Sequence, residues 1–224
     1  MMKIDLTGTH EENMTAMDVV PLFATPLMQF ELDLDLEKLT EFAFEMWNKD
    51  KRGVRGSNIG GWQSDNNIEE EYEEFIRLKK EISQYLQKYH SIIFSRMEFK
   101  TNVVQSLANM WINNNEKYHY NNWHNHPGAT LSGVYYIKHD GSREQGDIMF
   151  KHPVNQFTHI VTNHWPLELI KKHNEITSGV INVTPKSNKL LIFPSWLEHR
   201  VEANLKNESR ISLSFNSTLK PEIK

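Results

Sequence analysis

The sequence predicts a mostly β protein with a helical annex, in which a jelly-roll core is backed by two or more N-terminal helices. Two observations lead to this fold class. After Ser91 the chain consists of short β-prone runs separated by Asn, Gly, Pro and Asp, as in an antiparallel sheet. Before Ser91, two segments carry apolar residues at helical spacing. About eight strands suit a jelly roll, whose two sheets leave an open mouth between them.

Length and composition agree with one ordinary globular domain. The chain has 224 residues, of which 38% are hydrophobic and 24% are charged, and these values are usual for a single folded unit. We expect one domain over residues 1–224. It would comprise a polar N-terminal segment (1–18), a strand with helical support (19–98) and the β-rich core (99–216).

The N-terminal elements follow from caps and apolar spacing. An extended segment is expected over residues 19–30, where two prolines bound an apolar run. A helix should begin behind Asp35, a good N-cap, because apolar residues then recur every three or four positions up to Trp47. A longer helix should begin near Asn67, which with Glu70 imitates a capping box, and its apolar face extends to Tyr89.

The remaining elements are predicted strands, and the two helices should back one of the sheets that they form. The expected strands are residues 99–104, 108–112, 131–137, 147–150, 179–183, 190–193, 199–203 and 210–215.

Composition also excludes several function classes. A formal net charge of -4 gives no clustered excess of Lys and Arg, so we expect no nucleic-acid partner. The absence of cysteine rules out disulfides, thiolate metal sites and thiol nucleophiles, and is compatible with a cytoplasmic location. No stretch approaches the roughly 20 apolar residues of a membrane span, and the start of the chain lacks the apolar core of a signal peptide.

A histidine pair, His124 and His126, is the strongest chemical signal. Because side chains alternate between the two faces of a strand, residues two apart point the same way, and one metal ion can contact both imidazoles. Pro127 follows directly and favours a strand end, where the sheet opens. With 11 histidines in the chain, the pair alone could be incidental and lie on the surface. His199, on a later predicted strand, shifts the interpretation to a metal site with three imidazole ligands.

The last predicted strand has one polar and one apolar face. Its polar row is Arg210, Ser212, Ser214 and Asn216, and its apolar row is Ile211, Leu213 and Phe215. The polar row could face solvent, which is common in antiparallel sheets. Its position shortly after His199 favours the alternative, in which the row faces the mouth of the jelly roll. There Arg210 could pair with a carboxylate and Ser212 could add a hydroxyl donor.

Other residues near these motifs carry weaker signals. The amides of Asn113 and Asn115 could orient an imidazole ligand or could be turn residues. The aromatic residues that could line a pocket, although most aromatic residues in strands are core, are Trp123, Tyr135, Tyr136, Phe150 and Trp196. The histidines to which no role is assigned, and which are expected at the surface, are His119, His139, His152, His159, His164 and His173.

Several separated motifs in one order resemble the 2-oxoglutarate and iron(II)-dependent oxygenase superfamily and, more narrowly, an uncharacterised bacterial and phage family of such oxygenases. The resemblance covers roughly residues 21–215 and implies a double-stranded β-helix, a cupin-like jelly roll. The motifs are Gly60-Gly61-Trp62-Gln63-Ser64, His124-Asn125-His126-Pro127, Leu131-Ser132-Gly133-Val134-Tyr135-Tyr136, Phe193-Pro194-Ser195-Trp196-Leu197-Glu198-His199 and Arg210-Ile211-Ser212-Leu213-Ser214-Phe215-Asn216.

The resemblance also implies a ligand set. His124 and His199 would hold Fe(II), while Arg210 and Ser212 would bind the distal carboxylate of 2-oxoglutarate. The superfamily places Asp or Glu two residues after the first histidine, whereas this sequence has His126 there. His126 is therefore expected as the third ligand. Asp147 is kept in reserve as an alternative carboxylate, although a solvent-facing strand end is its more typical position.

These residues predict a 2-oxoglutarate- and Fe(II)-dependent dioxygenase. It would use O2 to hydroxylate an unidentified substrate, with release of succinate and CO2. Two alternatives stay open: a three-histidine, cupin-like metal dioxygenase that does not use 2-oxoglutarate, and a non-catalytic jelly-roll binding module. The apolar helix faces also allow a homodimer. The expected location is the cytoplasm, or the host-cell cytoplasm if a phage encodes the chain.

Overall fold

The computed structural model describes residues 24–66, 68, 72–95, 97–154, 164, 168, 170–172 and 177–222. The polar segment expected over residues 1–18 lies outside these residues, as does the beginning of the extended segment expected over 19–30. Within the described part, that segment forms a strand only at β1, Met28–Glu31.

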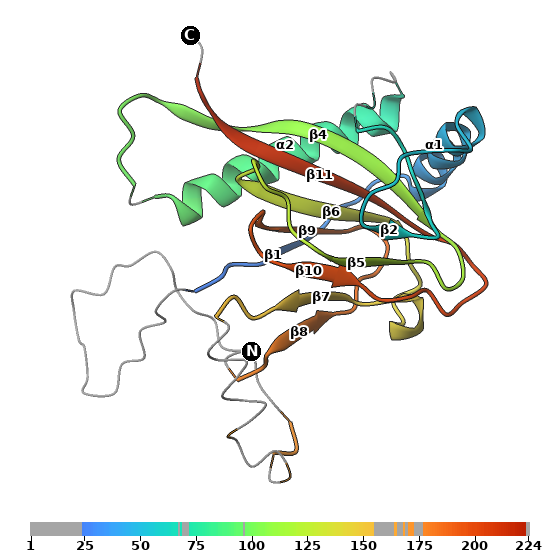
Figure 1. Cartoon of the computed structure of the whole chain (residues 1–224). Helices are drawn as coiled ribbons and strands as arrows, with labels where there is room; N and C mark the ends of the chain where they lie inside the picture. Colours follow the sequence, from blue (N-terminus) through green and yellow to red (C-terminus); the bar gives the residue numbers. More distant parts are fainter. Residues whose placement is uncertain are drawn as a thin grey trace.

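Two antiparallel sheets form the body of the protein and confirm the predicted jelly roll (Figure 1). The larger sheet has, in spatial order, β1, β9 (Lys189–Pro194), β6 (Leu131–Lys138), β11 (Arg210–Pro221), β4 (Val103–Asn115) and β3 (Trp62–Gln63). The smaller sheet has, in spatial order, β2 (Asn58–Ile59), β5 (Tyr120–His124), β10 (His199–Val201), β7 (Ile148–Lys151) and β8 (Val180–Val183). A short 3-10 helix, η1 (Arg143–Gln145), precedes β7.

Two helices cover the outer face of the larger sheet, as predicted. α1 (Leu36–Lys49) contacts β6 and α2 (Glu73–Ile93) contacts β4 (Figure 1). Asp35 is the N-cap of α1, because its carboxylate accepts a hydrogen bond from the backbone N–H of Lys38 at 3.1 Å.

The start of the second helix was predicted too early. α2 begins at Glu73 behind Tyr72, which makes no side-chain capping bond. Ile68, expected on the helical face, is buried but not helical. The cap expected from Asn67 and Glu70 falls on residues outside the described part. Apolar spacing alone therefore predicted a helical position for Ile68, a residue that packs against the core without being helical.

Alternating side chains of the larger sheet divide the protein into two cores. On β6, Tyr135 and Ile137 face the helices and belong to the larger core. Val134 and Tyr136 face the smaller sheet and belong to a second, smaller core. This alternation is the period of two that a sheet covered on both faces requires. The inner face of the larger sheet thereby becomes available to form the wall of a site between the sheets.

Two strand predictions were wrong in detail. Residues 99–104 and 108–112 were expected as separate strands, but β4 is one continuous strand of 13 residues. Polar Gln105 does not interrupt it, because its side-chain amide is buried and donates to Ser217 of the neighbouring β11 at 2.8 Å. The Asn-rich β5 was not among the strands expected from β-prone runs, since its composition has low β propensity, although the spacing of His124 and His126 indicated a strand end there. No helix in the described residues is long and apolar enough to cross a membrane.

Candidate metal and cosubstrate site

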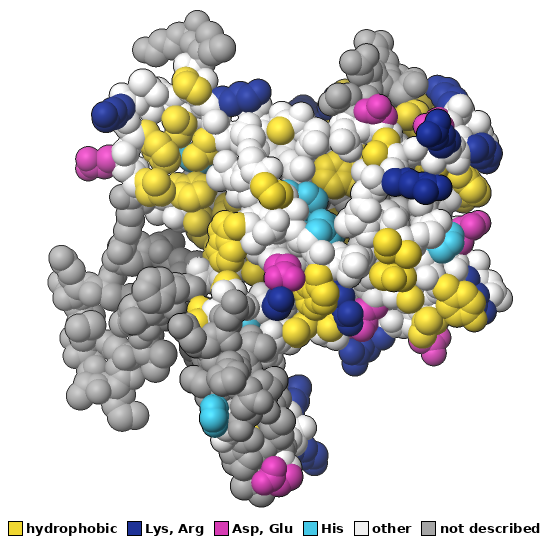
Figure 2. Space-filling view, viewed as in Figure 1, with side chains coloured by type: hydrophobic (Ala, Val, Ile, Leu, Met, Phe, Trp, Pro, Cys, Tyr) yellow, Lys and Arg dark blue, Asp and Glu magenta, His cyan; other side chains and the backbone are white. Residues whose placement is uncertain are grey.

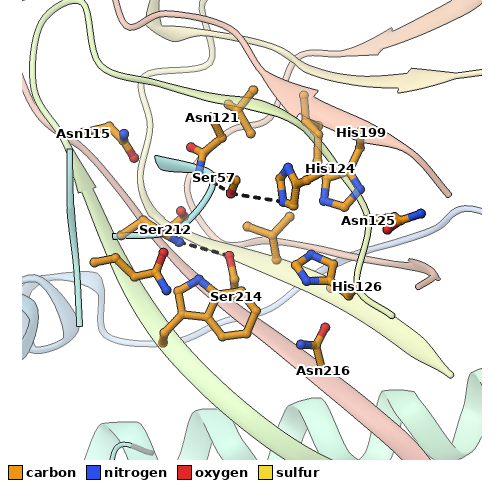
Figure 3. Close-up of a pocket in the computed structure, with 18 of the residues that line it drawn as sticks. Ser57, Asn115, Asn121, His124, Asn125, His126, His199, Ser212, Ser214 and Asn216 are labelled. Atoms are coloured by element: carbon orange, nitrogen blue, oxygen red, sulfur yellow. Dashed lines mark hydrogen bonds between the residues drawn. The ribbon is translucent and has the colours of Figure 1, made fainter. Parts of the chain in front are cut away.

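Three histidines meet between the sheets. One ring nitrogen from each of His124, His126 and His199 lies within 4.8 Å of the others. The ring centroids are 4.3 Å apart for His124 and His199, 5.0 Å for His124 and His126, and 5.3 Å for His126 and His199. Figure 3 shows the three rings turned towards one another at one side of the pocket. The structure thus brings together the three histidines that the sequence singled out.

Strand pairing positions the first and last of these histidines. His124 is the last residue of β5 and His199 the first of β10, and the two are direct partners in the antiparallel register. His126 was expected on the same strand as His124, but β5 ends before it. A turn places it instead, held by a hydrogen bond from its backbone N–H to the carbonyl oxygen of Ser195 at 2.9 Å. The end of β5 therefore positions His124, and the turn that follows positions His126.

Backbone carbonyls orient two of the rings. Nδ1 of His124 lies 2.7 Å from the carbonyl oxygen of Asn122, and Nδ1 of His199 lies 2.8 Å from that of Leu197. A carbonyl can only accept, so each Nδ1 carries the proton and donates. This leaves the lone pair on Nε2 of each ring, the arrangement usual for histidines that ligate metals. In His124 this nitrogen lies 3.4 Å from the hydroxyl oxygen of Ser57 (Figure 3), a long contact that a bound metal ion would replace.

Burial keeps the three imidazoles uncharged at neutral pH. Burial, together with repulsion from His124, lowers the pKa of His199 to about 3 and that of His126 to about 4. Burial also lowers the pKa of His124, although the bond to the Asn122 carbonyl opposes this shift. Because neutral imidazole is the form that binds a metal, the cluster is ready to do so without losing protons. Three neutral nitrogen donors suit a first-row divalent metal such as iron.

The reserve carboxylate does not join this cluster. Asp147 was expected at a solvent-facing strand end, but it is only 1% exposed and lies just before β7. Its carboxylate accepts a hydrogen bond from Nε of Arg143 at 3.1 Å. It is absent from the group of possible metal ligands among the described residues. The structure therefore gives no support to Asp147 as a ligand.

A second polar group lies at the buried end of the same pocket. Arg210 is 1% exposed, and its Nη1 donates to the carbonyl oxygens of Gln145 at 2.6 Å and Glu202 at 3.0 Å. Its Nη2 is buried and has no hydrogen-bond partner among the described residues, and the same holds for the hydroxyl of Tyr136. Burial lowers the pKa of Arg210 to about 10, so the guanidinium stays charged at neutral pH.

The polar row of β11 faces the pocket rather than solvent. Arg210, Ser212, Ser214 and Asn216 all line it. The alternating residues Ile211, Leu213 and Phe215 are fully buried against the helices. The interpretation that directs this row into the mouth of the jelly roll is therefore correct.

The pocket-facing residues of β4, the strand next to β11, were only partly predicted from the sequence. Asn113 and Asn115 line the pocket but do not orient a histidine, since their amides donate to Ser214 and to Asn58. Trp111 and Asn109 complete this row. The sequence signal for this row is incomplete, because Trp111 interrupts the alternate asparagines and Asn114 adds a polar residue to the opposite face.

The pocket has a volume of about 340 Å³. Its polar lining, besides the histidines and Arg210, is Ser57, Gln63, Asn66, Asn109, Asn113, Asn115, Asn121, Asn125, Ser212, Ser214 and Asn216. Tyr136 is the one member of the five predicted pocket aromatics found among the lining residues. Trp111 and Phe193, which had not been assigned to the pocket, supply its other rings.

Of the other histidines expected at the surface, those that the structure describes do not line the pocket, and one of them is buried. His139 was expected at the surface but is 4% exposed, and its Nδ1 accepts a hydrogen bond from the backbone N–H of Gly141 at 3.0 Å. His164 is exposed, and His119 and His152 are half-buried. His159 and His173 lie outside the described residues.

One family model matches the C-terminal part of the chain. Residues 109–216 match a protein-family model described as "Putative 2OG-Fe(II) oxygenase". This segment contains all three clustered histidines as well as Arg210 and Ser212. No curated protein sequence matches the chain significantly.

Solved structures share the fold at low sequence identity. A prolyl-4-hydroxylase from Pseudomonas putida is 14% identical, with a TM-score of 0.55 over 86% of this chain and 92% of that chain. The non-heme alpha-ketoglutarate-dependent carbocyclase SnoK from nogalamycin biosynthesis is 13% identical, with a TM-score of 0.58 over 86% of this chain and 79% of that chain. HygX from Streptomyces hygroscopicus, with nickel and 2-oxoglutarate bound, is 12% identical, with a TM-score of 0.51 over 87% and 83%.

Proposed function

We propose that the protein, whose residues 109–216 belong to a 2OG-Fe(II) oxygenase family, is an oxygenase that uses Fe(II), 2-oxoglutarate and O2 to hydroxylate a further substrate. In this proposal His124, His126 and His199 hold the iron, and Arg210 with Ser212 binds 2-oxoglutarate. The observation that carries it is the presence of both groups in one pocket: a cluster of neutral imidazoles and a buried, charged guanidinium.

The residues of the pocket fit both Fe(II) and 2-oxoglutarate. Each histidine of the cluster offers one nitrogen, and three ligands leave positions free for a chelating cosubstrate and oxygen. Nη2 of Arg210 and the hydroxyl of Tyr136 are buried donors that lack an acceptor within the part of the chain that the structure describes. A buried donor without a partner costs roughly 1–3 kcal/mol, so a carboxylate that accepts from both would be bound favourably.

Bound iron and 2-oxoglutarate would together supply the redox chemistry, in which O2 is reduced, the keto acid is converted to succinate and CO2, and a substrate C–H bond is oxidised. The protein supplies orientation and a dry pocket. Arg210, fixed by two backbone carbonyls, would hold the distal carboxylate at the buried end. The nearly complete burial of Arg210 and Ser212 keeps bulk water away from that end.

Anaerobic absorption spectroscopy tests this proposal directly. Adding Fe(II) and then 2-oxoglutarate to the metal-free protein should produce a weak visible charge-transfer band, because the keto acid would chelate the iron through two oxygens. The band should appear neither with Zn(II) nor with succinate, which lacks the keto group. If Fe(II) binds but 2-oxoglutarate gives no band, the protein is not a 2-oxoglutarate oxygenase.

A three-histidine metal dioxygenase that needs no keto acid is the second candidate. The observation in its favour is that no carboxylate among the described residues joins the imidazole cluster. This enzyme would oxidise its substrate at the same rate with and without 2-oxoglutarate, and it would release no succinate. The third candidate, a non-catalytic jelly-roll module, would bind no metal tightly.

A homodimer and a cytoplasmic location, or a host-cell one if a phage encodes the chain, also stay predictions. Sedimentation of the purified protein tests the first. Fractionation of the producing cell tests the second.

A further inference from the structure

The solvent exposure of the pocket changes along the paired strands β4 and β11. Their register places Arg210 opposite Asn115 at one end and Asn216 opposite Asn109 at the other. Arg210 and Asn115 are each 1% exposed, whereas Asn109 and Asn216 are only half-buried. The pocket therefore has a closed end at Arg210 and an open end at Asn109. If 2-oxoglutarate occupies the closed end, as proposed above, the open end receives the substrate that is oxidised.

The open end carries no formal charge. Arg210 is the one permanently charged side chain among the described residues that line the pocket, and no carboxylate or lysine lines it. Figure 2 shows histidine side chains near the centre of this face, bordered mostly by uncharged atoms. A phosphate, carboxylate or ammonium group entering there would lose its hydration without gaining an ionic partner, which is unfavourable.

Two unpaired side-chain oxygens on the β4 wall, one at the open end and one opposite Ser212, point to a substrate that donates hydrogen bonds. The side-chain oxygens of Asn109 and Asn113 are buried and have no hydrogen-bond partner among the described residues. A side-chain amide has one donating and one accepting end. A hydroxyl group can satisfy either end because it both donates and accepts.

An aromatic ring lies between these amides. Trp111 stands between Asn109 and Asn113 on the same face of β4, and its ring centroid is 5.7 Å from that of His126. Its side chain gives the open end an apolar surface against which the C–H face of a ring can pack. The pocket volume of about 340 Å³ is at the low end for ligand pockets, so one small ring fits beside a cosubstrate.

We propose that the substrate presents to the iron an uncharged, hydroxyl-bearing ring, namely a sugar or the sugar moiety of a nucleoside. Asn109 and Asn113 would bind its hydroxyl groups and Trp111 would pack against its ring. This inference rests on the proposed function for the end of the pocket that 2-oxoglutarate occupies, but its test requires no catalysis.

Saturation-transfer NMR on the protein loaded with Zn(II) and 2-oxoglutarate tests this proposal without turnover. The probes are methyl glucoside and adenosine, compared with the charged relatives glucose 6-phosphate, gluconate, glucosamine and AMP. We expect at least one uncharged probe to bind at least 10-fold more tightly than its charged relatives. Whichever of methyl glucoside and adenosine binds more tightly shows whether the ring belongs to a free sugar or to a nucleoside. Equal or tighter binding of the charged relatives, or no binding of either uncharged probe, would overturn the proposal.

An isosteric variant tests the assigned residues. Asn109→Asp places a carboxylate at the open end without changing its volume, so it should shift the preference between glucosamine and methyl glucoside at least 10-fold towards glucosamine. Asn182→Asp is the matched control, because Asn182 is exposed on β8 and does not line the pocket. An unchanged preference in Asn109→Asp would contradict the assignment. The charge-transfer band of Fe(II) and 2-oxoglutarate does not require a sugar, so failure of this proposal and of the proposed function can be distinguished.

Discussion

At the scale of single residues, His126 is the position at which this chain departs from the carboxylate usual in the superfamily that it resembles. Its ring nitrogen lies in the cluster with those of His124 and His199, whereas the nearest alternative in the sequence, Asp147, is buried elsewhere beside Arg143. The identity of the third ligand can therefore be tested by comparing two substitutions.

We expect His126→Ala to lower the affinity for Fe(II) at least 10-fold, because it removes one of the three proposed ligands. His126→Asp should retain the metal, since a carboxylate can replace the imidazole. Asp147→Asn should leave the bound iron unchanged. Iron content after equilibrium dialysis is the measurement. Loss of iron in Asp147→Asn with retention in His126→Ala would reverse the assignment.

Adjacent tyrosines on β6 provide a second comparison. The hydroxyl of Tyr136 is an unpaired donor that lines the pocket, whereas that of Tyr135 donates to Asn188 on the opposite face of the sheet. Tyr136→Phe should raise the dissociation constant for 2-oxoglutarate roughly 10–150-fold, as expected for the loss of about 1.5–3 kcal/mol from a bond to a charged group. Tyr135→Phe should not change it. Titration of the charge-transfer band measures both constants, and equal values for the two variants would remove Tyr136 from the site.

The sequence revealed much of the candidate site at this scale. The histidines and the Arg210 row could be found because they follow local rules of alternation and order. The role of the Tyr136 hydroxyl could not be predicted. Tyr135 and Tyr136 are adjacent, and the sequence does not indicate which of the two hydroxyl groups will lack a hydrogen-bond partner. The expected exposure of Asp147 and His139 was wrong for a related reason: polar residues at strand ends are buried here by loops that return from distant segments.

At the scale of elements, the turn between η1 and β7 supports the closed end of the pocket. Gly146 has a φ of +97°, and a Cβ atom at this position would collide with Nη1 of Arg210 and the carbonyl of Glu202. The backbone of this turn also accepts a hydrogen bond from the guanidinium, through Gln145. The turn and Arg210 therefore depend on each other for position.

We expect Gly146→Ala to weaken 2-oxoglutarate binding at least 10-fold by displacing the guanidinium, with Fe(II) binding unchanged. Gly141→Ala is the control, because Gly141 also has a positive φ, of +83°, but its added Cβ would meet only Lys186 at 3.7 Å. It shares the backbone strain of about 1 kcal/mol without the collision. If both variants bind 2-oxoglutarate equally weakly, backbone strain rather than contact with Arg210 causes the loss of affinity. If neither variant loses affinity, the turn does not position the guanidinium.

An ion pair between two loops should make stability depend on pH. Partial burial raises the pKa of Asp140, but hydrogen bonds from Lys206 and Ser142 outweigh this effect and lower it to about 2. The pair therefore stabilises the folded state above about pH 4, the ordinary value for Asp, and this contribution disappears as the pH falls towards 2. Lys206→Met should be less stable than the natural protein at pH 6 and equally stable near pH 2.

Urea unfolding at several pH values measures this difference. Lys117→Met is the matched control, because Lys117 bonds the neutral amide of Asn207. Its effect on the free energy of unfolding should be the same at pH 6 and at pH 2. A Lys206→Met effect that does not change with pH would show that the ion pair is not the cause.

Element boundaries were the least predictable feature at this scale. Asp35 marked the start of α1 because a cap is a local signal. α2 has no capping side chain, so its start could not be located from the sequence. β5 is too rich in asparagine to be recognised locally. It forms because it pairs with β2 on one side and β10 on the other, and such long-range pairing cannot be read from composition.

At the scale of the whole molecule, the two cores are unequal. The helices and the larger sheet enclose the larger one, which includes Leu78 of α2. The smaller one lies between the sheets, next to the pocket. The number and type of strands predicted a jelly roll, but the sheet that the helices cover and the face left for the site depend on how the strands are ordered in space.

We expect Leu78→Ala to lower the free energy of unfolding by about 2–5 kcal/mol, because Leu78 is fully buried and truncation leaves a cavity. Fe(II) affinity at low temperature should not change, since the helix layer lies on the far side of the larger sheet from the histidines. Ile76→Ala, on the exposed face of the same helix at 52% exposure, should change stability by less than about 0.5 kcal/mol. Urea unfolding and iron titration measure the two effects, and a weakened iron site in Leu78→Ala would argue against this separation.

The three histidines come from the end of β5, the turn after it and the start of β10, all on the side of the molecule with the smaller core. An ion shared by these segments would cross-link them where little apolar packing does so. Metal loading should therefore slow backbone amide exchange in β5 and β10 while leaving α2 and β4 nearly unchanged. The amount of available iron would then determine how well this protein resists proteolysis, as well as its catalytic activity.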